Sequence, residues 1–195
     1  YAIGLSTVQR QEWSKVQGRF ENITFMESTA QMLYLMQKAL EQDFPRDVRI
    51  KINNFAEKAH QFILKGDLAD KDKLDPDTIS NLYPLHPITV IALLEFCRKF
   101  AQNDRTLLSF LCSGDRLALP AYLEKTHIGS DLPVLGLDYL YDYFFNISST
   151  AYSNRAESQR WIEIHYMVEN AGYKNDMEKI LLKTIGVLNL LSASL

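Results

Sequence analysis

The sequence predicts a mainly α-helical protein, and three observations carry that prediction. Apolar residues recur every three or four positions in several segments, the period of a helix with one buried face. Residues that favour helix starts and helix ends stand at the borders of these segments. The β-prone material is one short run, Ile23-Thr24-Phe25-Met26. We therefore expect helical subdomains, with at most a short β-strand near the N-terminus.

The first 66 residues predict two well-defined helices after a less regular beginning. A short helix is expected over residues 8–17, broken at Gly18, before the β-prone run. Ser28 followed three residues later by Gln31 is a capping-box pattern, which marks the start of the next helix. Its apolar stripe is Met32, Leu35, Met36, Ala39 and Leu40. A longer helix, capped by Asp47 and ended by Gly66, has the stripe Val48, Ile52, Phe55, Ala56, Ala59, Phe62 and Ile63.

The central part predicts a charged loop followed by two helices. Residues 67–81 are charged and contain Asp75-Pro76-Asp77, so we expect a loop or a single turn. Pro87 suits the first turn of a helix, and the apolar stretch that follows to Phe100 should be buried. His86 is expected to cap this helix rather than to act in catalysis. Asn103 is a good N-cap for a helix from Arg105 to Leu111 that ends near Ser113 and Gly114.

The last third predicts a connector and a second helical region. Residues 114–135 are rich in glycine and proline and leave room for one short helix near 121–125. Residues 137–145 are rich in tyrosine, phenylalanine and leucine, and without interleaved basic residues we expect these rings to pack rather than to stack on bases. Helices are expected over 156–170 and 177–191. The apolar stripe of the second is Met177, Ile180, Leu181, Thr184, Val187, Leu188 and Leu191.

Composition is that of an ordinary globular protein. The 195 residues are 47% hydrophobic and 23% charged, with a formal net charge of −3 that gives no overall attraction to nucleic acid. We expect no membrane span and no signal peptide, and we expect the chain to begin inside a longer protein, since it lacks an initiator methionine. Cys97 and Cys112 lie in apolar helical contexts and are expected to be buried free thiols, which fits a cytoplasmic protein.

Catalytic motifs are missing from the sequence. It contains no phosphate-binding loop of the G-x-x-x-x-G-K-[ST] type, no dinucleotide-binding glycine turn, and no hydrophobic run that ends in paired acids. The four histidines have no metal-ligand spacing, and no C-x-x-C pair is present. We therefore expect no catalytic residue, no metal and no cofactor in this chain alone.

Two arginine motifs remain as candidate functional features. The first is Gly18-Arg19-Phe20-Glu21, before the β-prone run and the capped helix. The second is Gln102-Asn103-Asp104-Arg105, at the start of an apolar helix. A guanidinium is always charged and presents a planar fork of donors, so it suits contact with phosphate. The plainer alternatives are that Arg19 pairs with Glu21 or Glu27 and that Arg105 lies at a solvated helix start.

Taken together, the motifs resemble a family of large bacterial P-loop ATPases. They are Trp13-Ser14-Lys15-Val16-Gln17-Gly18-Arg19-Phe20, Tyr83-Pro84-Leu85-His86-Pro87, Gln102-Asn103-Asp104-Arg105 and Leu182-Lys183-Thr184-Ile185-Gly186-Val187-Leu188-Asn189. This pattern is similar to AAA+ proteins, in particular to the phage-defence ATPases of BREX-type systems. The resemblance implies that residues 1–27 end the ATPase core, that 28–112 form the helical lid, and that 113–195 form a second helical region, in which the last helix could begin a winged helix.

The same resemblance implies roles and partners. Arg105 would be the nucleotide sensor of the lid and Arg19 a finger that reaches the nucleotide of a neighbouring copy, with Asn103 and Gly18 in support. ATP and Mg²⁺ would bind the intact parent protein, whose remaining core would be the first partner of this chain. Nucleic acid stays an open partner that no sequence feature favours. The rival hypothesis is a helical protein–protein interaction module that binds no nucleotide and exposes an apolar groove.

Overall fold

The computed structural model describes residues 28–66, 71–100, 104–151 and 156–192, and this part of the chain is mainly helical. Its elements, in order, are α2 (Thr29–Ala39), α3 (Arg46–Lys65), the 3₁₀ turn η1 (Lys71–Lys73), α4 (Pro76–Asn81), α5 (Pro87–Phe100), α6 (Asp104–Cys112), α7 (Leu119–Lys125), α8 (Leu137–Ala151), α9 (Ala156–Asn170) and α10 (Asp176–Ser192). The expected helix at 8–17 and the β-prone run at 23–26 lie outside the described residues. The mainly helical fold class is confirmed.

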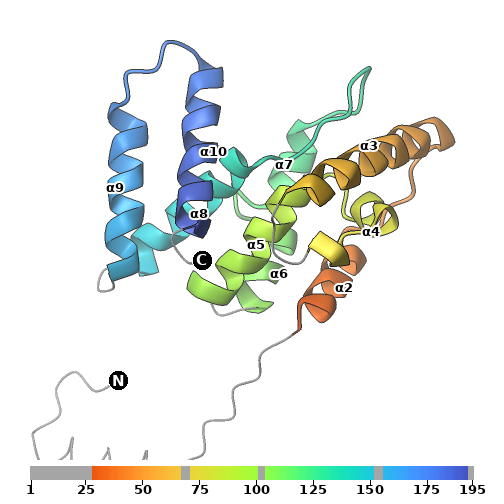
Figure 1. The fold of residues 1–195 in the computed structure, drawn as a ribbon, viewed down its shortest axis with the longest axis horizontal. Helices are drawn as coiled ribbons and strands as arrows, with labels where there is room; N and C mark the ends of the chain where they lie inside the picture. The colour runs from red at the N-terminus through yellow and green to blue at the C-terminus, as the bar shows by residue number, and fades with distance from the viewer. Residues whose placement is uncertain (1–27, 67–70, 101–103, 152–155, 193–195) are drawn as a thin grey trace, which may run out of the picture.

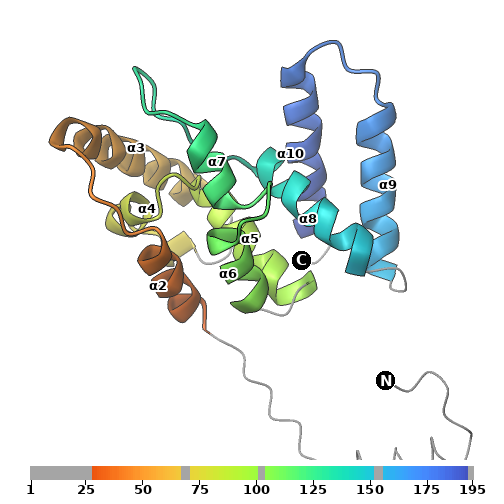
Figure 2. The ribbon, with the colours of Figure 1, turned by 180° about the vertical axis from the view of Figure 1, so that it is seen from behind.

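Helix α5 lies at the centre of the molecule and contacts α3, α6, α8 and α10 (Figure 1). Helices α2, α3 and α4 lie on one side of it, and α8, α9 and α10 lie on the other, as the view from behind also shows (Figure 2). Every side chain from Thr89 to Leu94 is buried. Six consecutive residues cover all directions around a helix, so α5 is enclosed on every side over this stretch. The expectation of a buried apolar helix after Pro87 is confirmed.

Most helices begin or end at the capping residues that the sequence predicts. The Ser28 capping box is present, with the Gln31 amide donating to Ser28 Oγ at 3.3 Å and the Ser28 amide donating to Gln31 Oε1 at 2.9 Å. His86 caps α5, since its Nδ1 accepts from the Ile88 amide at 3.2 Å and its carbonyl accepts from the Val90 amide. Gly66 ends α3 as expected. These local signals place the helices correctly along the chain.

Three expectations about elements are wrong. Asp47 does not cap α3, because the helix already begins at Arg46 after Pro45, and the Asp47 carboxylate lies within the first turn. Residues 71–81 are not only a loop, because Asp75 caps a helix that opens on Pro76. Phe62 was expected on the buried stripe of α3, yet it is 67% exposed, since the helix buries a narrower stripe through Ile52, Ala56 and Ile63.

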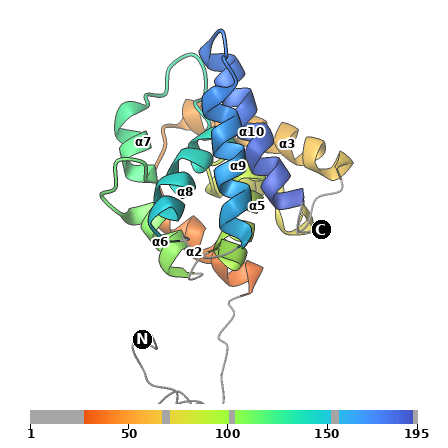
Figure 3. The ribbon, with the colours of Figure 1, turned by 90° about the vertical axis from the view of Figure 1, so that its left-hand side faces the viewer.

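The apolar stripe predicted on α10 is divided between surface and core. Its members Met177, Ile180, Leu181 and Leu188 are exposed, whereas Val187 of the same stripe is buried together with Leu190. Helix α10 contacts α5, α8 and α9, and these contacts fix which side is buried. Most of this stripe is therefore exposed, on a helix that lies side by side with α9 (Figure 3).

The connector between α7 and α8 crosses back over the first half of the chain. Leu135 forms an isolated parallel bridge with Leu85, in which the Leu135 amide donates to the Pro84 carbonyl at 2.8 Å and the His86 amide donates to the Leu135 carbonyl at 3.1 Å. The buried Thr89 hydroxyl donates to the same Leu135 carbonyl at 3.0 Å. Lys51 Nζ on α3 donates to the carbonyls of Gly129 and Ser130. The connector is thus fixed to both α3 and α5.

Candidate functional site

Three helix ends meet at one edge of the molecule, which we call the α2–α6 edge: residues 28–31, the last turn of α5 and the first turn of α6. Helices α2 and α6 pack against each other. Thr29, the first residue of α2, contacts Arg98 near the end of α5, and only residues 101–103 separate α5 from α6. The starts of α2 and α6 therefore lie near each other, and each helix start carries a partial positive charge.

Arg98 is the described cation at the α2–α6 edge. Its Nη1 donates to Glu95 Oε1 at 2.6 Å, and its Nη2 donates to the Thr29 hydroxyl. Through these contacts one guanidinium joins α5 to the first residue of α2. Arg98 belongs to none of the motifs in the sequence. The Glu95–Arg98 spacing of three residues was visible as a helical ion pair, but the contact with Thr29 spans 69 positions and left no local signal.

Arg105, the residue predicted to sense the nucleotide, belongs to the α2–α6 edge through its position in the first turn of α6. Arg105 is the second residue of α6, so the expectation that it occupies the first turn of a helix is confirmed. The position of its side chain lies outside the described residues, as do Asn103, Gly18 and Arg19. Whether Arg19 and Arg105 share one cleft therefore stays a prediction.

Helix α6 is held firmly by its apolar face. Leu107 and Phe110 are fully buried, and the Phe110 ring meets the Tyr143 ring of α8 edge-on at 4.8 Å. The rings of residues 137–145 do pack in the core as expected, with Tyr141, Tyr143 and Phe144 all buried. Burial raises the pKa of Tyr143 above its ordinary value.

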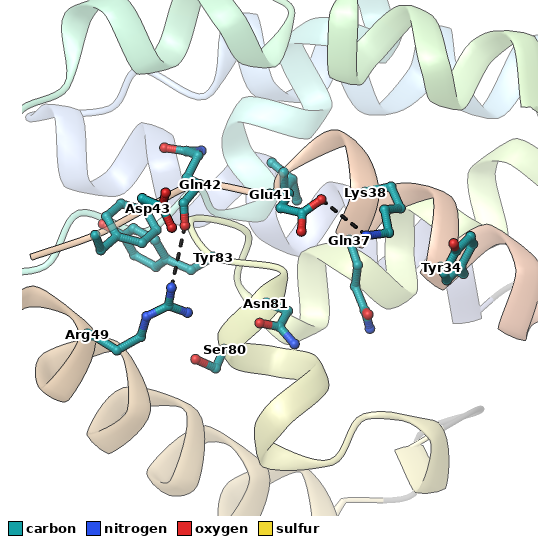
Figure 4. Close-up of a pocket in the computed structure, with 12 residues that line it drawn as sticks. Tyr34, Gln37, Lys38, Glu41, Gln42, Asp43, Arg49, Ser80, Asn81 and Tyr83 are labelled. Atoms are coloured by element: carbon teal, nitrogen blue, oxygen red, sulfur yellow. Dashed lines mark hydrogen bonds and ion pairs between the residues drawn. The ribbon is translucent and has the colours of Figure 1, made fainter. Parts of the chain in front are cut away.

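A polar pocket of about 240 Å³ lies between α2, the loop before α3, and α4 (Figure 4). Arg49 of α3 reaches across it, with Nη2 donating to the Gln42 carbonyl at 3.5 Å and the guanidinium 6.0 Å from the centre of the Phe44 ring. Lys38 pairs with Glu41 on the opposite wall at 3.2 Å. Its lining includes the side chains of Lys38, Glu41 and Asp43, so this pocket offers polar and charged contacts.

Tyr83 is the most buried polar residue that lines this pocket. The residue is 3% exposed, and its hydroxyl has no hydrogen-bond partner among the described residues. Burial, followed by the nearby Tyr122, raises the pKa of Tyr83 to about 12. The Phe44 ring packs edge-on against the Tyr83 ring at 5.7 Å. The Tyr83 phenol therefore stays protonated at neutral pH.

The titratable groups in the described part of the chain give no metal centre. No cluster of three or more histidine, cysteine, aspartate or glutamate side chains that could hold a metal ion is found there. Cys97 and Cys112 are both thiols rather than a disulfide, as expected, but Cys112 is exposed, contrary to expectation. Within the same residues, no helix combines the length and apolar character needed to cross a membrane.

Comparison with known proteins does not identify the chain. No protein family model, no curated protein and no solved structure matches it.

Proposed function

We propose that this chain is the lid and the following helical region of a larger AAA+-like ATPase, where it senses the nucleotide and couples its state to lid movement. The observation that carries the proposal is the position of Arg105 in the first turn of α6, beside the start of α2 and directly after the end of α5. The resemblance to BREX-type ATPases assigns the parent protein to phage defence and to the cytoplasm. The chain itself is not catalytic in this proposal.

The chemistry of the α2–α6 edge supports a sensor of phosphate. A guanidinium in the first turn of α6 adds a full positive charge to the partial charges of two helix starts, which favours an approaching phosphate oxygen. Helix α2 carries no acidic residue in its first turn, whereas α6 opens on Asp104, directly before Arg105. ATP and Mg²⁺ would be held by the parent's ATPase core, since the described residues provide no ligand set for the cation.

Coupling to the lid follows from packing. Leu107 and Phe110 anchor α6 to the core, and Arg98 anchors the start of α2 to α5. A phosphate that attracts the Arg105 side chain would therefore move α2, α5 and α6 together rather than bend one helix alone. Arg19 would complete the nucleotide site of a neighbouring copy, with Asn103 and Gly18 shaping the two turns.

The test is ATP turnover by the intact parent protein. We expect Arg105→Ala to lower kcat by about 10²-fold or more, the usual effect of losing a donor to transition-state charge. Arg19→Ala should lower turnover only under conditions where the copies assemble. Arg46→Ala is the matched control, because Arg46 opens α3 just as Arg105 lies in the opening turn of α6, and its turnover should equal that of the unmodified protein. Normal turnover in both the Arg105 and Arg19 variants would refute the assignment.

A protein–protein interaction module is the second candidate, and one observation favours it. Several large apolar side chains of α9 and α10 are more than half exposed, among them Met177 and Tyr166. Apolar faces of this kind mark contact surfaces in soluble proteins. The two functions do not exclude each other, because this surface and the α2–α6 edge belong to different helices.

A further inference from the structure

The outer face of the α9–α10 hairpin is the most apolar exposed surface of the described helices. We define it by seven exposed side chains: Ile162, Tyr166, Met167, Met177, Leu181, Ile185 and Leu188. Both helices bury their opposite sides, α9 through Trp161, Ile164 and Val168, and α10 through Val187 and Leu190. The two helices lie side by side (Figures 1 and 3). Met167 of α9 and Ile185 of α10 line the same groove, which joins the exposed apolar side chains of the two helices.

A groove runs along this outer face between the two helices. It has a volume of about 360 Å³ and is lined by Met167, Leu182 and Ile185, with Arg160, Glu163 and Asn189 as its polar members. Its floor is set by Gly186, where the absence of a β-carbon lets Ile164 of α9 approach closely. The groove is therefore a rigid product of helix packing and not a gap between loose segments.

A second hairpin of the same kind has the right shape to cover this face. Two helical hairpins that meet through apolar faces form a four-helix bundle. Helices α9 and α10 comprise 15 and 17 residues, and only their outward sides can contact a partner. The interface would therefore be smaller than the standard size of about 20–30 residues from each partner, which fits a dimer that dissociates on dilution. The seven apolar side chains would supply most of the apolar area of such an interface.

The charges on the groove favour a second copy over an unrelated helix. Arg160 and Glu163 are opposite in sign, lie three residues apart, and both line the groove. A two-fold axis passing between them would bring each Arg160 against Glu163 of the other copy, because every contact in a two-fold interface occurs twice. Arg160 already extends along this groove, with Nη2 donating to Asn189 Oδ1 of α10 at 2.7 Å.

We propose that the chain dimerises through the outer face of α9–α10, two hairpins packing antiparallel with reciprocal Arg160–Glu163 pairs at the two-fold axis. The inference is independent of nucleotide sensing, since none of these residues belongs to the α2–α6 edge. It goes beyond the proposed function by assigning a self-association surface to the second helical region.

The test is the solution mass of the chain, measured by light scattering after gel filtration and by analytical ultracentrifugation. At about 100 μM, well above a micromolar Kd, we expect a dimer that dissociates on dilution. Ile185→Asp should yield a monomer. Ile50→Asp on α3 is the matched control, because Ile50 is 53% exposed and Ile185 51%, and this variant should remain dimeric. Far-ultraviolet circular dichroism checks that both variants stay folded.

A charge exchange tests the two-fold arrangement itself. Glu163→Arg and Arg160→Glu should each weaken dimerisation at least tenfold, because like charges would meet at the axis. The double variant Arg160→Glu with Glu163→Arg should restore the dimer. A wild-type monomer at about 100 μM would overturn the proposal and leave the face to a different protein. A dimer that survives Ile185→Asp, or a double variant that fails to recover, would overturn it as well.

Discussion

At Gly186 in α10, a single hydrogen stands where any other residue would carry a β-carbon. An ideal β-carbon there would meet Ile164 Cγ2 of α9 at 2.7 Å, which is closer than real side chains approach. Glycine is normally a poor helix residue, costing about 1 kcal/mol relative to alanine. Its presence in the middle of α10 is explained by the close approach of the two helices.

The first prediction follows from that contact. Gly186→Ala should lower the free energy of unfolding by about 1–3 kcal/mol, because overpacking between α9 and α10 outweighs the better helix propensity of alanine. Urea unfolding measured by circular dichroism gives the value. Gly129→Ala is the control, since a β-carbon at Gly129 would meet no atom within 4 Å. An increase in stability for Gly186→Ala would contradict the packing described above.

At the scale of elements, the short helix α4 depends on its first cap. Asp75 Oδ1 accepts from the Thr78 amide at 2.7 Å, and this backbone hydrogen bond is the main reason that the pKa of Asp75 is lowered. A carboxyl whose pKa is lowered on folding stabilises the protein above its ordinary pKa, and this contribution is lost as the pH falls through the folded-state pKa. The cap is thus strongest at neutral pH and weakest in acid.

Substitutions at Asp75 separate the hydrogen bond from the charge. Asp75→Ala should lower the free energy of unfolding at pH 7 by about 1 kcal/mol, the usual cost of losing an N-cap. Asp75→Asn keeps an acceptor, so its stability at pH 7 should stay close to that of the unmodified chain. Because asparagine does not titrate, this variant should lose less stability below about pH 5. Acid titrations that superimpose for aspartate and asparagine would show that the cap does not act through its charge.

The borders of most helices could be predicted because their signals are local. A capping box at Ser28, a proline at position 87 and a glycine at position 66 act on neighbouring backbone groups. The exposure of most of the α10 stripe could not be predicted, since periodicity shows that a helix has an apolar side but not whether the rest of the same chain covers it. The Leu85–Leu135 bridge likewise joins segments 50 positions apart and has no local pattern.

The candidate site was predictable in part for the same reason. Arg105 in the first turn of a helix follows from the capping pattern at Asn103 and Asp104. The proximity of that turn to the start of α2 depends on the packing of α2, α5 and α6, which no motif encodes. Arg98, whose contact with Thr29 joins two of these helices, is visible only in three dimensions.

At the scale of the whole molecule, one apolar cluster spans both sides of α5. Phe96 lies at its centre, with its ring 5.0 Å from the Phe144 ring of α8 and 5.5 Å from the Trp161 ring of α9. The cluster also includes Met32 and Met36 of α2. Elements that share one core are expected to unfold together.

Unfolding experiments test this shared core. In a Trp13→Phe background, where Trp161 is the only tryptophan, urea unfolding should give the same transition by fluorescence and by circular dichroism. Phe96→Ala should lower the free energy of unfolding by about 3–5 kcal/mol without separating the two transitions. Phe62→Ala on α3 is the control and should change stability by less than about 0.5 kcal/mol, because Phe62 is exposed. Two distinct transitions would show that the sides of α5 fold independently.

The enclosure of α5 also determines how the molecule can move. A helix with side chains packed on every side cannot swivel in place, because each rotation would replace fitted contacts with clashes or voids. Motion between the α2–α6 edge and the α9–α10 hairpin therefore has no hinge within α5. Helix α5 therefore moves as one rigid element, and a displacement of one end also displaces the other end.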